Sequence, residues 1–240
     1  MSTWQFYLLL VCIFLSIGLN SASRFRLQNR CNGTVWAGIQ GGTGHPHMKN
    51  GGIQIRSGDT IAVDAPKKWS GRFWGRQDCF FDNKGKGSCL TGDCDGLLQC
   101  GGKGWTPPVS VAHFKLDSPV DYYYVSLVDG YNLPISIIPT AGSGNNCKPI
   151  RCFSDLNIIC PHDLQFVNQQ GKVVACNSAC QAFNLPEYCC SGSFNSSVTC
   201  KASQFSQVFK SACPNAYSYA FDNNSTTFTC KGADYFIRFC

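Results

Sequence analysis

Residues 85–100, with the sequence GKGSCLTGDCDGLLQC, hold the densest group of side chains that could do chemistry. Asp93 and Asp95 flank Cys94, and carboxylates beside a thiol can bind a metal ion or activate a nucleophile. Alternatively, the cysteines form disulfide bonds and the glycines permit the turns that short disulfide loops need. The residue types alone leave both interpretations open.

His45 and His47 are the second arrangement that could bind a metal ion, because two imidazoles so close in sequence can share one ion. No third ligand lies near them, and the surrounding glycines indicate a loop tip. The chain has only 4 histidines and no Cys-x-x-Cys pair with partner histidines. It also lacks a phosphate loop, a nucleotide fingerprint and a Gly-x-Ser-x-Gly motif. We therefore expect no metal site and no cofactor.

The cysteine content points to an oxidising compartment. Residues 6–19, FYLLLVCIFLSIGL, form an apolar run that is too short to span a membrane. Ser21 and Ser23 place small side chains at −3 and −1 of a cut after Ser23, which is typical of a secretory signal peptide over residues 1–23. Removing Cys12 with it leaves 16 of the 17 cysteines, an even number that fits eight disulfides.

Composition favours a β-rich protein that does not bind nucleic acid. Glycine accounts for 24 of the 240 residues, and only 14% of the residues are charged. The formal net charge is +6, but the basic residues are scattered and not interleaved with aromatic ones. A mildly basic surface of this kind can favour acidic polysaccharides or anionic membranes.

Short segments that alternate apolar and polar residues predict strands. Turn signals such as Ser57-Gly58-Asp59 separate them, so a β-sandwich is expected. The segments are FRLQ (25–28), VWAGI (35–39), IQI (53–55), TIAV (60–63), VSVAHFKL (109–116), YYYVSLV (122–128), LPISII (133–138) and YFIRFC (235–240).

Two irregular, cysteine-rich segments interrupt this pattern, residues 77–107 and 147–213. We expect disulfides to replace a hydrophobic core there. Within the second segment, Phe205 and Phe209 belong to an i, i+3, i+4, i+7 apolar pattern that predicts one amphipathic helix. Ser203 is its expected N-cap, and Pro214 follows its end.

Four asparagines stand in Asn-x-Ser/Thr sequences and are candidate glycosylation sites: Asn32, Asn195, Asn223 and Asn224. The last two are adjacent, so we expect at most one of that pair to carry a glycan.

The segment at residues 85–100 closely resembles the signature of the thaumatin-like proteins, the pathogenesis-related group that includes the osmotin-type antifungal proteins of plants. Further segments that resemble the family follow in the right order, so the resemblance covers residues 24–240. They are NRCNGTVWAGI, FWGRQDC, SLVDGYNLPI, CPHDLQ, YCCSG, CPNAYSYAFD and TFTC.

The resemblance implies a mainly β fold: a thaumatin-like β-sandwich (residues 24–76, 108–153 and 214–240) with two smaller disulfide-rich lobes. These are a small lobe at residues 77–107 and a cysteine-rich lobe at residues 154–213. The family pairing implies eight disulfides, Cys31–Cys240, Cys79–Cys89, Cys94–Cys100, Cys147–Cys230, Cys152–Cys213, Cys160–Cys176, Cys180–Cys189 and Cys190–Cys200. It makes residues 85–100 a scaffold, with Asp93 bonded to local backbone or a nearby arginine.

Many members of this family carry an acidic cleft between the sandwich and the cysteine-rich lobe, built from one Arg, one Glu and three Asp. The matching positions here are Arg72, His113 in place of the Glu, Tyr124 in place of the first Asp, Asp129 and Asp222. The family pattern sums to a charge of −3, whereas these residues sum to −1, or to zero if His113 is protonated.

These replacements bear on catalysis, because glycoside hydrolysis needs two carboxyl groups that flank the bond. The single Glu of the chain, Glu187, lies beside the cysteines at 189 and 190, and we expect it away from the cleft. No catalytic residue is assigned with certainty, and Asp129 and Asp222 are the candidates. We therefore expect weak or absent hydrolase activity, with His113 in a hydrogen-bonding role.

The resemblance then implies a secreted, monomeric defence protein that binds β-1,3-glucan or the fungal cell surface through this cleft. An exposed ring among Tyr122, Tyr123 and Tyr124 could stack on a sugar, although packing in the sheet is the alternative. A weak endo-β-1,3-glucanase that uses Asp129 and Asp222, and a protein-binding inhibitor of microbial hydrolases, are the other functions considered. The protein would be secreted to the extracellular space, and the sequence does not distinguish the apoplast from the vacuole as its destination.

Overall fold

The computed structural model of the chain describes residues 21–117, 119–152, 154–222 and 227–240. Most of the predicted signal peptide and the candidate glycosylation sites Asn223 and Asn224 lie outside the described residues. The first strand begins at Ser21, so the expected cut after Ser23 falls within it. Asn32 and Asn195 are both exposed, as an acceptor site requires, and their glycosylation stays a prediction.

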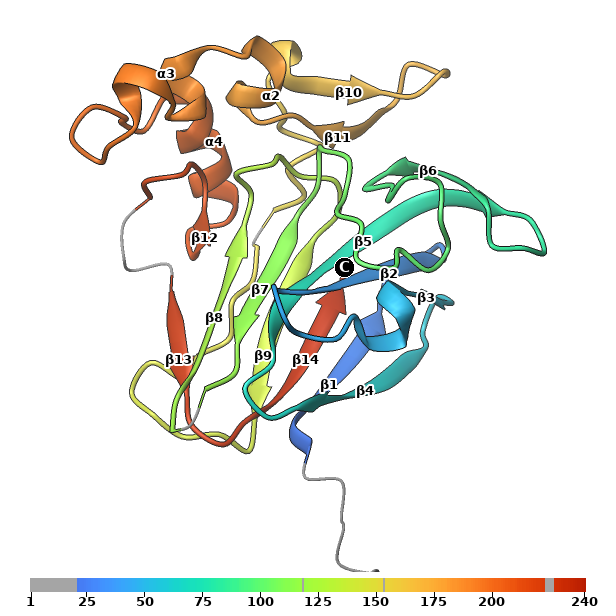
Figure 1. The fold of residues 1–240 in the computed structure, drawn as a ribbon. Coiled ribbons are helices and arrows are strands. Elements are labelled where there is room, and N and C mark those ends of the chain that lie inside the picture. The colour runs from blue at the N-terminus through green and yellow to red at the C-terminus, as the bar shows by residue number, and fades with distance from the viewer. Residues whose placement is uncertain (1–20, 118, 153, 223–226) are drawn as a thin grey trace, which may run out of the picture.

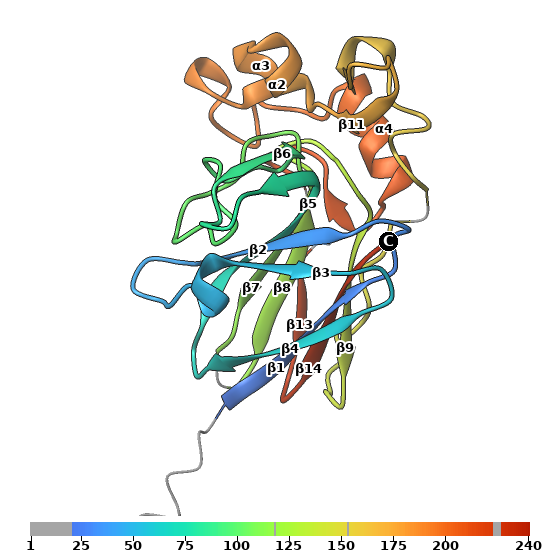
Figure 2. The ribbon, with the colours of Figure 1, turned by 90° about the vertical axis from the view of Figure 1, so that its right-hand side faces the viewer.

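Two sheets form the body of the molecule (Figures 1 and 2). The first has four strands in the order β4 (Thr60–Pro66), β1 (Ser21–Asn29), β14 (Asp234–Phe239) and β9 (Ile135–Thr140). The second has eight strands, and its main path runs β12 (Ala216–Tyr217), β8 (Asp121–Ser126), β7 (Val111–Lys115), β5 (Ser70–Phe81), β2 (Val35–Gly41) and β3 (Gly52–Ile55). Two further strands join it, β13 (Phe228–Cys230) beside β8 and β6 (Gly87–Thr91) beside β5.

The strands that alternation predicts are present, because their apolar faces meet between the sheets. Phe25 of β1 lies in register with Tyr235 of β14, and both are fully buried. Phe25 also contacts Phe73 and Phe114 of the opposite sheet, with ring centroids 4.8 Å away in each case. Each buried aromatic of this kind stabilises the fold by about 1.5–3 kcal/mol.

The cysteine-rich lobe lies at one end of the sandwich (Figure 1). It contains the hairpin β10 (Gln165–Val167) and β11 (Val173–Cys176), and the short helices η2 (His162–Leu164), α2 (Ala179–Phe183), α3 (Pro186–Cys189) and η3 (Gly192–Phe194). The predicted amphipathic helix is confirmed as α4 (Gln204–Ala212). The side chain of Ser203 caps it by accepting the backbone N–H of Ser206. A further short helix, η1 (Met48–Gly51), precedes β3 in the sandwich.

All eight disulfide pairs that the family resemblance implies are present. Cys31–Cys240 joins the start of the sandwich to its last strand across 209 residues. Three others, Cys160–Cys176, Cys180–Cys189 and Cys190–Cys200, close loops of 16, 9 and 10 residues within the cysteine-rich lobe. Short cross-links of this kind stabilise a segment that buries little apolar surface.

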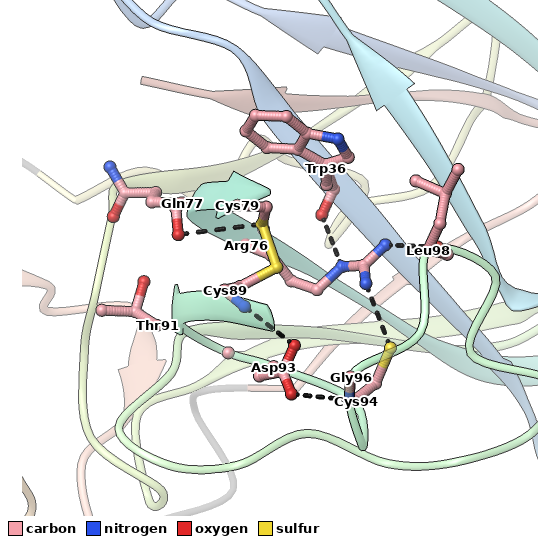
Figure 3. The surroundings of a disulfide bond; sticks show 12 residues. Trp36, Arg76, Gln77, Cys79, Cys89, Thr91, Asp93, Cys94, Gly96 and Leu98 are labelled. Atoms are coloured by element: carbon pink, nitrogen blue, oxygen red, sulfur yellow. Dashed lines mark hydrogen bonds between the residues drawn. A yellow bond between two sulfur atoms is a disulfide. The ribbon is translucent and has the colours of Figure 1, made fainter. Parts of the chain in front are cut away.

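The small lobe is attached to β5 by a buried arginine. Arg76 is fully buried, and its guanidinium donates to the carbonyls of Trp36 and Leu98 at 3.1 and 2.7 Å (Figure 3). It also donates to the carbonyl of Leu97 at 2.6 Å. Burial lowers the pKa of Arg76 to about 10, since the charged form loses its hydration. The carbonyls therefore replace water around a charge that has no carboxylate in direct contact.

The two carboxylates that made residues 85–100 conspicuous have structural roles. Asp93 accepts the backbone N–H groups of Cys89 and Gly96 at 3.0 and 2.8 Å (Figure 3). Asp95 forms an exposed ion pair with Lys103 at 3.0 Å. The expectation that Asp93 bonds to local backbone is confirmed, because its carboxylate holds the turn of the disulfide loop through the backbone N–H groups of that loop.

Replacing Arg76 tests whether it anchors the small lobe. Arg76→Leu leaves three carbonyls without their donor, so we expect a loss of about 3–5 kcal/mol in the free energy of unfolding. Urea denaturation of the oxidised protein measures this loss. Arg56→Leu, at an exposed arginine, is the matched control and should change stability by less than about 0.5 kcal/mol. Equal effects of the two substitutions would rule out the anchoring role.

Candidate functional site

Three of the five predicted cleft residues form one row on the outer face of the eight-stranded sheet. Arg72 of β5 pairs with His113 of β7, and His113 pairs with Tyr124 of β8. Their sequence neighbours Phe73, Phe114 and Tyr123 point into the core. Because side chains alternate along a strand, the register places the three site residues together on the opposite face.

His113 is neutral at physiological pH, which corrects the idea that it could add a positive charge. Its ring stacks on that of Tyr124, with centroids 4.4 Å apart and planes inclined by 8°. Burial, and then the positive charge of Arg72, lower the pKa of His113 to about 3. The imidazole therefore offers one donor and one acceptor and is not a cation even in a mildly acidic extracellular space.

The tyrosine that faces the cleft, Tyr124, packs against two neighbouring aromatic rings. Tyr123 is buried, whereas Tyr122 and Tyr124 point outwards, so the predicted alternation is confirmed. His113 covers one side of the Tyr124 ring, and Tyr217 of β12 contacts it from the other neighbouring strand at 4.9 Å. Sugar stacking on the side of the Tyr124 ring that His113 covers is therefore blocked, and the Tyr124 hydroxyl is a polar group that a ligand can contact.

Trp105 connects Arg72 to Asp129, and sequence reasoning missed it. The guanidinium carbon of Arg72 lies 5.5 Å from the centre of the Trp105 ring system. The indole N–H of Trp105 donates to Asp129 Oδ2 at 3.1 Å, and Trp74 packs against its ring at 5.3 Å. A tryptophan in a glycine-rich loop was the available signal, but the sequence does not show which residues it meets.

Asp222, the fifth predicted residue, is occupied by structural contacts. Its Oδ2 accepts from Lys210 Nζ at 3.0 Å and from the backbone N–H and hydroxyl of Ser218 at 2.9 and 3.0 Å. Only 7% of its side chain is exposed. Asp222 thus ties α4 to the loop after β12, and it is not an open carboxylate that could attack a sugar.

A cavity of about 210 Å³ lies between the sandwich and the cysteine-rich lobe. Its polar wall includes Asp129, Gln181, Glu187 and Lys201, but Asp222 does not line it. Glu187 was expected away from the cleft, and that expectation is wrong. The disulfide Cys180–Cys189 links α3 to α2, and Cys190–Cys200 ties the end of α3 to the following loop. Glu187 on α3 thereby lines the same cavity as Asp129.

The site is less acidic than the family pattern. With Asp222 bonded to Lys210, the charged side chains of the site are Arg72 and Asp129 from the sandwich and Glu187 and Lys201 from the cysteine-rich lobe.

Across the described ranges, no three His, Cys, Asp or Glu side chains lie together as a metal site. The ring of His47 accepts the backbone N–H of Gly41 at 3.0 Å. No helix in that part of the chain is long and apolar enough to cross a membrane.

The pKa of His113 predicts a pH-dependent loss of stability. The folded state keeps this imidazole neutral down to about pH 3, whereas the unfolded chain protonates it near its ordinary pKa of about 6.5. Stability is therefore complete above about pH 6.5 and decreases as pH falls towards 3, by at most about 1.4 kcal/mol per pH unit. Urea denaturation at several pH values should show a shallower decrease for His113→Gln.

An NMR titration checks the same prediction at the ring itself. The His113 resonances should not move between pH 7 and about pH 4, while His162, with 95% of its side chain exposed, serves as the solvent-exposed reference. A His113 midpoint near pH 6 would contradict the neutral assignment.

Replacing Asp222 should lower the stability of the fold without changing ligand binding in the cavity. Asp222→Asn leaves Lys210 without its charged partner, so we expect a loss of about 1–3 kcal/mol in the free energy of unfolding. Chemical denaturation provides the value, and polysaccharide binding of the folded variant should match the parent. Binding lost without a change in stability would show instead that Asp222 contacts the ligand.

Comparison with known proteins identifies the family. The thaumatin family model matches residues 29–240. A pathogenesis-related thaumatin-like protein 3.5 from Cryptomeria japonica is 52% identical over 219 residues, which cover 91% of this chain and 90% of the relative. Pathogenesis-related protein 5 from Arabidopsis thaliana is 48% identical over 235 residues, covering 97% and 96%.

Solved structures agree on the fold. The thaumatin-like xylanase inhibitor TLXI matches with a TM-score of 0.52 at 20% identity, covering 90% of this chain and 98% of the inhibitor. A β-1,3-glucanase domain from Clostridium beijerinckii matches with a TM-score of 0.50 at 11% identity, covering 93% and 100%. At these identities the likeness concerns the fold alone. The chain therefore belongs to the thaumatin family, and its resemblance to pathogenesis-related thaumatin-like proteins implies a role in defence.

Proposed function

We propose that this protein is a secreted antifungal defence protein that binds β-1,3-glucan of the fungal wall without turning it over efficiently. The binding site is the cavity between the sandwich and the cysteine-rich lobe, together with the adjoining row on β5, β7 and β8. The relationship to pathogenesis-related proteins supports the defence role. The eight disulfides support passage through an oxidising, secretory compartment.

The occupied state of Asp222 is the observation that carries the proposal. Hydrolysis of a glycosidic bond needs one carboxyl group as acid and a second as base or nucleophile. Of the family positions, His113 and Tyr124 are not carboxylates, and Asp222 is held by Lys210 and Ser218. Asp129 alone remains on the cavity wall, so the family arrangement for hydrolysis is broken.

The groups that remain suit the recognition of sugar hydroxyls. The cavity combines carboxylate, amide and ammonium groups with the rings of Tyr188 and Tyr219. Its volume of about 210 Å³ is below the roughly 300–1,000 Å³ of sites that enclose whole small molecules. A cavity of this size fits one unit of a polymer better than it fits a complete free ligand.

A second candidate function, weak endo-β-1,3-glucanase activity, is favoured by one observation. Glu187 and Asp129 both line the cavity, so two carboxyl groups are present although one is in an unexpected position. Glu187 is exposed, however, whereas a general acid is normally surrounded by apolar groups that keep it protonated at neutral pH. We therefore rank hydrolysis below binding. Inhibition of a microbial hydrolase stays a further prediction, since the likeness to a xylanase inhibitor concerns only the fold.

Binding and hydrolysis of laminarin, a soluble β-1,3-glucan, separate these functions. We expect measurable retention of the protein by laminarin, weakened about tenfold by Asp129→Asn, because a charged hydrogen-bond acceptor and its contact with Trp105 are both altered. Affinity electrophoresis measures retention, and release of reducing ends measures hydrolysis. The matched control is Asp59→Asn, an exposed carboxylate at the turn between β3 and β4.

The hydrolysis arm decides between binding and catalysis. We expect no reducing-end release above background from the parent protein. Robust turnover that Glu187→Gln or Asp129→Asn abolishes would replace the binding proposal with the enzymatic one. Absence of laminarin retention would contradict glucan binding itself.

A further inference from the structure

Arg72 is an exposed cation with no anionic partner. No Asp or Glu lies within ion-pair distance of its guanidinium, and all acidic residues of the chain fall in the described ranges. Its neighbours across the sheet, Gln40 on β2 and His113 on β7, are uncharged. His113 and Tyr124 stand where the family pattern has Glu and Asp. The charge of Arg72 thus lacks the carboxylate that either position would supply.

The guanidinium is held in place although it is not neutralised. Its carbon lies 5.5 Å from the centre of the Trp105 ring system, a cation–π contact that favours a fixed orientation. Trp105 is itself fixed by Trp74 at 5.3 Å and by Asp129, which accepts its indole N–H. Asp129 therefore contacts the indole N–H and forms no ion pair with Arg72. Among the described residues, Arg72 makes no side-chain hydrogen bond, so its N–H donors remain open to a ligand.

The adjoining groups on the same row are neutral hydrogen-bonding groups. The side chain of Gln40 donates to the carbonyl of Gly102 at 2.8 Å, which keeps it beside Arg72. His113 is a neutral imidazole, and its stacked partner Tyr124 presents a hydroxyl. The row therefore combines the planar guanidinium of Arg72 with the neutral donors and acceptors of its neighbours. The protein as a whole has a formal net charge of +6.

We propose that Arg72, His113 and Tyr124 form a subsite for a carboxylate-bearing sugar, so that the protein binds uronic-acid polysaccharide in addition to neutral glucan. A guanidinium matches a carboxylate through two parallel N–H···O bonds, whereas the neutral imidazole and phenol suit the ring hydroxyls. The net positive charge attracts a polyanion before contact. This inference rests on the proposed function, because it assigns a ligand class to the same polysaccharide cleft.

Polygalacturonate and its fully methyl-esterified form provide a matched pair of probes, since they share a backbone and differ in charge. Calorimetry at low salt with the intact protein should give at least about tenfold tighter binding to the charged polymer. Arg72→Gln should abolish this preference. His113→Glu retains Arg72 but supplies it with a carboxylate across the strand pair, and should abolish the preference as well.

The control variant is Arg56→Gln, which removes the same charge from an exposed position outside the row and should retain binding within about twofold. Thermal denaturation confirms that each variant is folded. Equal losses in Arg72→Gln and Arg56→Gln would reduce the effect to net charge and overturn the proposal. Equal binding of the charged and esterified polymers would also overturn it.

Laminarin in the same format separates this inference from the proposed function. Binding of laminarin without a preference for polygalacturonate means that the glucan site stands and the uronate subsite fails. An Arg72-dependent preference for polygalacturonate without laminarin binding means that the subsite stands and the neutral glucan is not its ligand.

Discussion

The buried guanidinium of Arg76 holds the small lobe against the sandwich. It lies beside β5, where the carbonyls of Trp36, Leu97 and Leu98 surround it in place of water. Because an unpaired buried charge is costly, these carbonyls fix the position of the loop that carries them. The loop continues through Cys100 to Trp105, which packs on Trp74 in the small hydrophobic cluster next to the main core. The place of Trp105 in the cleft thus depends on Arg76.

Trp105 in turn organises the sandwich side of the cleft. The guanidinium of Arg72 lies over its ring in a cation–π contact, and its indole N–H donates to Asp129. Asp129 faces the cavity that the cysteine-rich lobe closes from the other side, where Glu187 stands on α3. The cleft is therefore assembled from all three parts of the molecule. The row on the sheet carries one cation and neutral hydrogen-bonding groups, whereas the cavity beside it combines carboxylate, amide and ammonium groups.

The sequence predicted the features that depend on local pattern. Alternation located β1 to β4, β7 to β9 and β14, and the spacing of Phe205 and Phe209 with a serine cap located α4. It did not predict β5, which carries Arg72 and Arg76, or the short strands β6 and β10 to β13. The disulfide pairs needed the family resemblance, because sixteen cysteines allow about two million pairings. Each misjudged feature depends on contacts between distant segments. Burial against Tyr124 keeps His113 neutral, and two disulfides bring Glu187 to the cleft.

Contacts between distant segments also explain why the family position of Asp222 wrongly indicates a residue of the cleft wall. Residue type placed it in the cleft, but its environment decides its role, because Lys210 on α4 lies close enough to bind it. Asp222 is paired with Lys210 and nearly buried, so it stabilises the structure and is not available as a catalytic carboxylate. Of the carboxylates at the family positions, only Asp129 therefore faces the cavity, beside the charged side chains of Arg72, Glu187 and Lys201. The loss of the family's carboxylate pair favours binding over bond cleavage.

A single NMR experiment tests this account most directly. A laminari-oligosaccharide is added to ¹⁵N-labelled protein, and the indole N–H signal of Trp105 and the anomeric signals of the sugar are followed together over time. The account predicts that the Trp105 signal shifts in a saturable manner while the anomeric signals of the sugar stay those of the intact oligosaccharide. An unchanged Trp105 signal, or new reducing-end signals that grow with time, would contradict it.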